Sequence, residues 1–81
     1  GKVVVSLKET LDDAKAGALE SVLVSSKLFE KGDESDIVEL LNATEKFGGK
    51  TYLVDSSTDT GNQVDVMGGV LGLLRYSLYK D

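Results

Sequence analysis

The chain lacks the residue types on which several kinds of protein chemistry depend. Its 81 residues include no cysteine, histidine or proline. Without cysteine it has no disulfide, zinc thiolate or thiol nucleophile, which is compatible with a reducing cytoplasm. Without histidine it lacks the commonest general base and a common metal ligand. We therefore expect a cytoplasmic protein that is not an enzyme.

Long apolar runs and an excess of positive charge are also missing. The composition, 41% apolar and 28% charged, is that of a globular protein. No segment approaches the roughly 20 apolar residues that a membrane-spanning helix needs. Fourteen acidic residues against nine basic ones give a net charge of −5, which disfavours a surface for nucleic acid. We expect a single domain over residues 1–81, with no membrane partner.

Apolar segments and capping residues predict strands that alternate with helices. The strands are expected at 2–5, 21–25, 51–54 and 70–74, where β-branched and leucine residues cluster. The internal strands are not interrupted by polar residues, which predicts a sheet covered on both faces. The expected fold class is α/β, a three-layer α/β/α sandwich with a mixed, mostly buried four-stranded sheet.

Three helices are expected between these strands. The first begins at Ser6, with Glu9 as its capping-box partner, and the second runs from Ser35 or Asp36 to about Phe47. The third is expected to begin with Thr60 as its N-cap and to turn Val64 and Met67 inward. The charged segment 27–35 contains glycine and is predicted to be a loop.

Three short motifs resemble cofactor or metal sites but lie in the wrong context. Residues 49–51 (GKT) lead from a helix into a strand, whereas a phosphate loop leads from a strand into a helix. Residues 68–72 (GGVLG) also lead into a strand, unlike a dinucleotide fingerprint. Asp55, Ser57 and Asp59 have calcium-loop spacing, but the required glycine and glutamate are absent. We expect no cofactor and no metal.

Acidic residues gather in the middle of the chain. They are Glu30, Asp33, Glu34, Asp36 and Glu39. Such a cluster is either a solvated surface that favours solubility or an acidic patch that steers a basic partner. Phe29 precedes the cluster and is either a core residue or an exposed interface anchor.

Nearly the whole chain resembles the C-terminal domain shared by Pelota-type ribosome-rescue factors and class-1 polypeptide release factors of eukaryotes and archaea. The matching segments, in chain order, are LKETL (7–11), AGAL (16–19), LVSSKLF (23–29), FGGK (47–50), GNQ (61–63) and GGVLGLLRY (68–76). Each segment alone is a weak signal, but their order and spacing are specific. The chain departs from the family pattern at Ser6, where glycine is common, and at Gly72, where alanine is frequent.

The resemblance implies a fold related to the kink-turn-binding ribosomal proteins and a noncatalytic domain that docks proteins. The implied partners are a translational GTPase and the ribosome-recycling ATPase with an iron–sulfur domain. The ribosome would be contacted through the full-length factor, of which this chain is one domain. The kink-turn signature is missing and the chain is acidic, so no direct RNA binding is expected from this domain.

Two features favour the rescue factors within this family. The segment 29–36 is short, whereas release factors usually carry an inserted minidomain there, and FGGK at 47–50 is closer to the rescue factors. The alternative is the equivalent domain of a release factor, because residues 57–60 and the LRY ending also occur in those proteins. A third interpretation is a stand-alone kink-turn RNA-binding protein.

The end of the last strand is the main candidate for partner contact. Arg75 and Tyr76 follow a buried strand, and an arginine beside an aromatic residue is typical of interface anchors. The structural alternative is that Arg75 pairs with a local carboxylate while Tyr76 caps the core. The predicted partner-binding residues are Arg75, Tyr76, Phe29, Glu30, Asp33 and Glu34.

Overall fold

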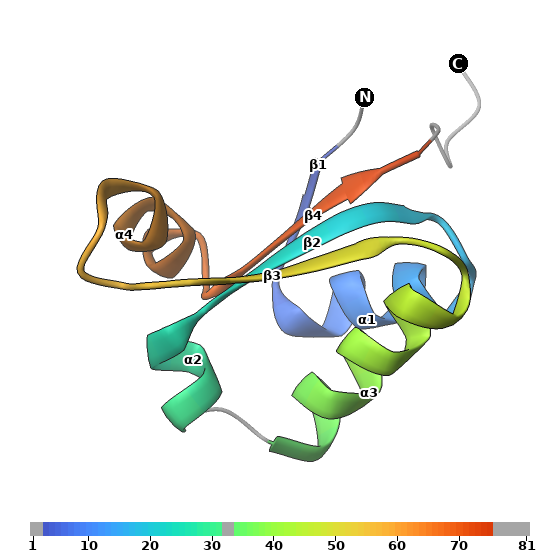
Figure 1. Ribbon diagram of the computed structural model, residues 1–81, viewed down its shortest axis with the longest axis horizontal. Helices are drawn as coiled ribbons and strands as arrows, with labels where there is room; N and C mark the ends of the chain where they lie inside the picture. Colours follow the sequence, from blue (N-terminus) through green and yellow to red (C-terminus); the bar gives the residue numbers. More distant parts are fainter. Residues whose placement is uncertain (1–2, 32–33, 76–81) are drawn as a thin grey trace.

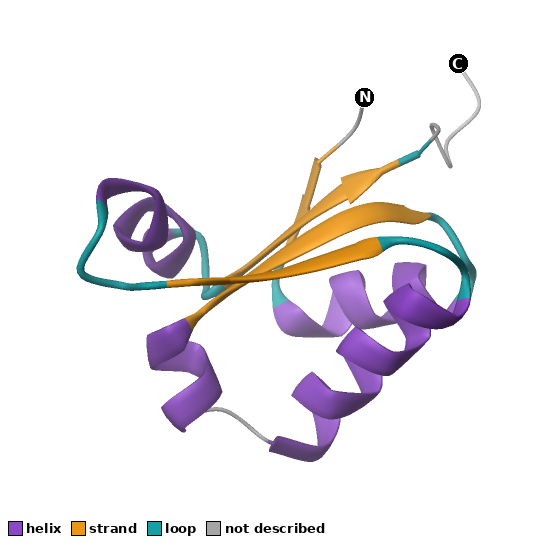
Figure 2. Cartoon of the chain, in the orientation of Figure 1, coloured by secondary structure: helices purple, strands orange, loops and turns teal. Residues whose placement is uncertain are grey.

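The computed structural model describes residues 3–31 and 34–75 of the chain. Strands alternate with helices along the chain (Figures 1 and 2). The elements, in order, are β1 (Val3–Val5), α1 (Leu7–Lys15), β2 (Leu19–Ser25), α2 (Ser26–Lys31), α3 (Glu34–Lys46), β3 (Lys50–Val54), α4 (Asp59–Val66) and β4 (Val70–Leu74). No helix within the described ranges is long and apolar enough to cross a membrane.

The four strands form one mixed sheet in the order β1-β4-β2-β3. The central pair, β4 and β2, is antiparallel, β1 is antiparallel to β4, and β3 is parallel to β2. The last strand of the chain therefore lies between the first and the second. The predicted α/β class and the mixed four-stranded sheet are confirmed.

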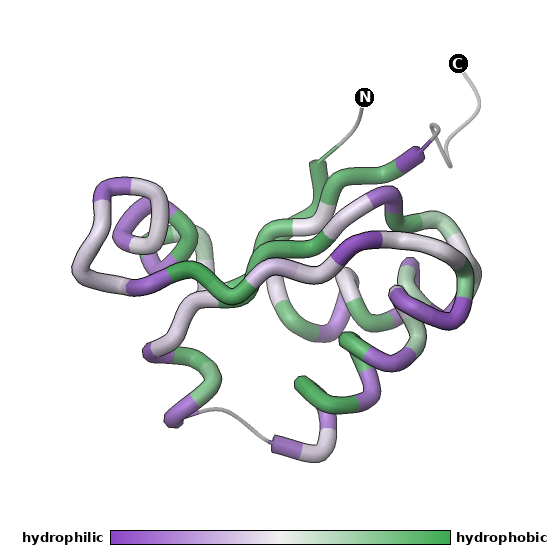
Figure 3. Tube along the Cα trace, in the orientation of Figure 1, coloured by the Kyte–Doolittle hydropathy of each residue, from purple (hydrophilic) through white to green (hydrophobic). Residues whose placement is uncertain are grey.

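The hydrophobic core lies between the sheet and the helices α1 and α3. These two helices pack against each other on one face of the sheet (Figure 1). The inward-facing side chains of the central strands are almost completely buried, and the strands are apolar along most of their length (Figure 3). The core includes Leu19, Val22 and Val24 of β2, Val70 and Leu74 of β4, and Ile37 and Leu40 of α3.

Gly72, in β4, is closely surrounded by side chains of β1, β2 and α1. A Cβ atom at this position would lie 2.9 Å from Val4 Cγ1, 3.0 Å from Leu19 Cδ2 and 3.1 Å from Thr10 Cγ2. These separations are shorter than an ordinary contact between carbon atoms. Glycine in the middle of β4 thus lets α1 pack tightly on the sheet.

On the opposite face of the sheet, the elements that the structure describes cover one end only. Helix α4 lies on that side, close to the end at which β4 begins (Figure 1). Val5, Leu71, Leu23 and Tyr52 are register partners across the four strands, so their side chains share one face. Val5 is 39% exposed and Tyr52 is 49% exposed. This outer row is an apolar surface on the molecule.

Segment 26–31 is helical, so the prediction of a loop over 27–35 was wrong there. Helix α2 has six residues and buries none of them. It is held at its start by two serine hydroxyls: Ser25 Oγ accepts the Leu28 N–H (3.1 Å) and Ser56 Oγ accepts the Lys27 N–H (3.1 Å). Capping of the first N–H groups stabilises this helix, and its partly buried Leu28 packs against the core.

The start and end of α4 also differ from the prediction. Its N-cap is Thr58, whose Oγ1 accepts the Gly61 N–H at 3.0 Å, and not Thr60. Gly61 packs tightly against the backbone of Asp55, so the turn closes two residues earlier than expected. Val64 is buried as predicted, but Met67 follows the helix and is 47% exposed.

Ser6 caps α1 in a backbone conformation that suits glycine. Its φ is 81° and its ψ is 141°, while its Oγ accepts the Glu9 N–H at 3.4 Å. The capping residue at this end is confirmed. A side chain at this positive φ is strained, so glycine is the residue best suited to this position.

Replacing Ser6 with glycine should therefore stabilise the domain. Relief of the strained φ outweighs the small loss of a serine cap, so the free energy of unfolding should rise by about 1 kcal/mol. Ser6→Ala is the matched control, because it keeps the Cβ atom and loses the cap, and it should lower stability. Urea unfolding of the three proteins measures both effects. If glycine and alanine destabilise equally, Ser6 is not strained.

Candidate docking surfaces

Four of the predicted partner-binding residues are described, and they lie at opposite ends of the sheet. Arg75 follows the last residue of β4, whereas Phe29 and Glu30 lie in α2 and Glu34 begins α3, near the end at which β4 starts (Figure 1). They therefore do not form one site. Asp33 and Tyr76 lie outside the described residues.

The side chain of Arg75 is bonded to the backbone of its own chain. Its Nη2 donates to the carbonyl oxygens of Phe47 (2.7 Å) and Leu19 (3.0 Å), and its backbone N–H donates to the carbonyl of Ala18 (2.9 Å). The guanidinium thus joins the end of β4 to the start of β2 and to the residue that follows α3. Carbonyl oxygens, rather than the local carboxylate expected as the structural alternative, accept these bonds.

Arg75→Ala should destabilise the domain. It removes two charge-assisted hydrogen bonds to backbone carbonyls, and because the site is solvent-accessible the expected loss is about 1–2 kcal/mol. Arg75→Lys should recover part of it, since an ammonium cannot reproduce the planar fork of a guanidinium. Lys8→Ala, at an exposed position on α1, is the control. Urea unfolding that places Arg75→Ala within the control's error would contradict this role.

Helix α2 carries Phe29, the apolar residue next to the predicted acidic cluster. Phe29 is 41% exposed, so it is not a core residue. Glu30, the next residue of α2, and Glu34, at the start of α3, are also exposed. All three side chains are therefore accessible to a partner.

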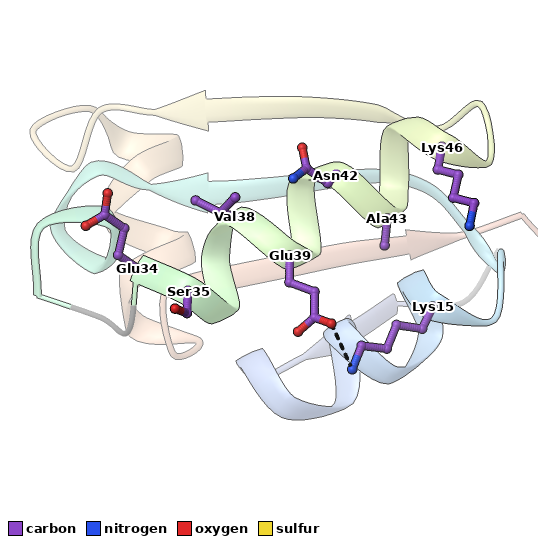
Figure 4. A pocket seen from close by; sticks show the side chains of 8 residues that line it. All are labelled: Lys15, Glu34, Ser35, Val38, Glu39, Asn42, Ala43 and Lys46. Atoms are coloured by element: carbon purple, nitrogen blue, oxygen red, sulfur yellow. Dashed lines mark ion pairs between the residues drawn. The ribbon is translucent and has the colours of Figure 1, made fainter.

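A shallow groove of about 640 Å³ lies along the outer side of α3 and the end of α1 (Figure 4). Lys15 Nζ and Glu39 Oε2 form an ion pair of 3.2 Å across it, with both side chains about half exposed. Such a pair contributes little to stability. Glu34 and Lys46 also line the groove. Because the charges balance, the groove does not select a partner by charge.

A second groove, of about 460 Å³, separates α2 from α4. A cluster of hydroxyls joins its two walls. Ser26 Oγ donates to Ser56 Oγ (3.2 Å) and accepts the Ser56 N–H (3.1 Å). On α4, hydrogen bonds from the side chains of Ser25 and then Ser56 lower the pKa of Asp65, and nearby Lys27 and Lys31 add to this effect. We did not expect this site from the sequence, because its lysines lie in the segment predicted to be a loop.

The pKa of Asp65 gives the domain a testable acid sensitivity. A carboxyl whose pKa is lowered from 3.8 by folding contributes stability above that pH, and loses the contribution as the pH falls through the lowered pKa. Asp65→Asn should therefore make stability fall less steeply with acid. Urea unfolding from about pH 5 to about pH 2 measures this, with Asp59→Asn on the same helix as the control. Parallel curves for wild type and Asp65→Asn would contradict the coupling.

The comparisons with known proteins cover almost the whole chain. The model of a domain family described as eRF1 domain 3 matches residues 1–78. The chain belongs to the eRF1 domain 3 family. Among curated proteins, a Pelota homologue of Nitrosopumilus maritimus is 42% identical over 77 residues, and one of Methanocaldococcus jannaschii is 32% identical over 78 residues. The matches cover 95% and 96% of the chain but 22% of each relative.

Solved structures of eRF1 domain 3 relatives share the fold. Archaeal Pelota, in a model of its ribosome-bound form with ABCE1, has a TM-score of 0.87 at 28% identity, over 95% of the chain and 22% of that protein. An archaeal termination factor, aRF1, has a TM-score of 0.70 at 22% identity, over 94% of the chain and 21% of that protein. The Pelota structure is thus the more similar of these two.

Proposed function

We propose that this chain is the C-terminal docking domain of a Pelota-type ribosome-rescue factor that acts in the cytoplasm. The domain, residues 1–81, is noncatalytic and binds a translational GTPase and the ribosome-recycling ATPase. The larger factor of which it is one part contacts the ribosome.

One observation carries this proposal: the 42% identity to a Pelota homologue extends over 95% of the chain. The fold agrees, because the archaeal Pelota structure has the higher TM-score and the aRF1 structure the lower one. The short connection between helices also favours a rescue factor. Helix α2 ends at Lys31 and α3 begins at Glu34, which leaves no room for an inserted minidomain.

The relatives and the surface support a docking role. One solved relative is ribosome-bound archaeal Pelota with ABCE1. Another, S. cerevisiae Dom34, is described as a termination-like factor that interacts with Hbs1, and it shares the fold at 24% identity with a TM-score of 0.87. On this chain, Phe29 (41%), Val38 (43%) and Val66 (80%) are exposed apolar side chains on three different helices. Exposed apolar side chains on several helices can be buried by a protein partner.

The composition supports the absence of catalysis in this domain. Without histidine or cysteine, a nucleophile and its base must come from carboxylates, lysine or hydroxyl groups. In residues 3–31 and 34–75, no three carboxylates come together in a metal-binding group. Peptide release and codon reading would belong to other domains of the full-length factor.

Titration of the ¹⁵N-labelled domain with a translational GTPase of Nitrosopumilus maritimus tests the proposal. We expect saturable changes in the amide signals of a contiguous surface, because docking changes the environment of contacted residues. The recycling ATPase of the same organism should give a second set of changes. A metabolic enzyme of similar charge is the control for nonspecific association.

The proposal fails if neither protein changes any signal of the folded domain. The alternative that the chain is a kink-turn RNA-binding protein is tested by adding a kink-turn RNA at low salt, where electrostatic attraction is strongest. Changes caused by that RNA alone would make the domain an RNA-binding module.

A further inference from the structure

The groove between α2 and α4 carries positive charge on an acidic chain. Lys27 and Lys31 both line it, and their four-residue spacing places them on the same side of α2. Asp65 is the one carboxylate in the described lining. The lining therefore has a net charge of +1, whereas the whole chain has −5.

The same groove presents apolar surface beside the lysines. Val66, at the end of α4, lines it and is 80% exposed. Leu28 and the two glycines that precede β4 also line the groove. A Cβ atom at Gly69 would lie 2.8 Å from Leu28 Cβ, so the missing side chain lets α2 lie against the start of the strand. Apolar side chains of a partner therefore have a surface to cover.

The walls of the groove are fixed before any partner arrives. The Ser26–Ser56 hydrogen bonds join α2 to the loop before α4, and Lys27 donates its N–H to Ser56 Oγ. Less conformational entropy is lost on binding when the walls are already ordered.

We infer that the α2–α4 groove receives a segment of the partner GTPase in which carboxylate side chains flank an apolar one. The carboxylates pair with Lys27 and Lys31, and the apolar side chain covers Val66 and Leu28. A nucleic acid fits less well, because the chain's negative net charge repels a phosphate backbone and the exposed Val66 side chain cannot donate a hydrogen bond to it. This inference deepens the proposed docking function and rests on it.

Charge reversal in the groove, with a matched reversal elsewhere, tests the inference. Lys27→Glu/Lys31→Glu should weaken binding of the GTPase about tenfold or more at low salt. Lys8→Glu/Lys50→Glu changes the net charge equally at exposed positions of α1 and β3, and should change the affinity by less than about threefold. Raising the salt should bring wild type towards the groove variant.

Val66→Ser tests the apolar part separately. Because Val66 is 80% exposed, the variant should fold normally, which its amide spectrum checks. It should weaken GTPase binding at high salt, where screening removes most of the charge contribution. The signals that change on binding should include Lys27, Lys31 and Val66.

The outcomes separate this inference from the proposed function. If the GTPase binds and both charge-reversed variants lose affinity equally, or neither does, the groove is not its site while the docking function stands. If the GTPase changes no signal, both are wrong. If a 20-nucleotide RNA, as a probe, changes the groove signals and the GTPase leaves them unchanged, the groove is a nucleic-acid site and the inference is overturned.

Discussion

Insertion of β4 between β1 and β2 is the constraint on which the structure depends. Within the described sheet, β1 pairs with β4 alone, so the first strand is held in place by the last. Gly72, in the middle of β4, also gives α1 the space to pack on the sheet. Because these contacts join the beginning of the chain to its end, the sheet is complete only when nearly all of the chain has folded.

The two ends of β4 have different tasks. At its end, Arg75 bonds to backbone carbonyls of Leu19 and Phe47 and so locks the sheet. At its start, Gly69 lies against Leu28, beside the groove between α2 and α4. Arg75, which the sequence suggested as an interface anchor, thus stabilises its own chain. The groove between α2 and α4, at the other end of β4, is the better candidate for partner recognition.

The sequence predicted those elements whose signals are local. The apolar residues of β2 and β4, the cap at Ser6 and the stripe of α3 are all short-range patterns, and they placed the α/β sheet correctly. Helix α2 was missed because it buries no residue and because one of its caps, Ser56, lies 29 residues along the chain from Lys27. The groove between α2 and α4 was missed as well, because one of its walls is this helix. The carbonyl partners of Arg75 are also distant in sequence, 28 residues away at Phe47 and 56 residues away at Leu19, so no local pattern indicates them.

We propose that the sheet centred on β4 is a rigid support for a docking surface at one end and does not rearrange when a partner binds. Amide hydrogen exchange, measured by NMR with and without the GTPase, tests it most directly. Amides of β2 and β4 should exchange slowest in the free domain, and their rates should not change with the partner, while exchange in α2 and α4 slows. Partner-dependent exchange in β4 with no change in α2 and α4 would contradict the account.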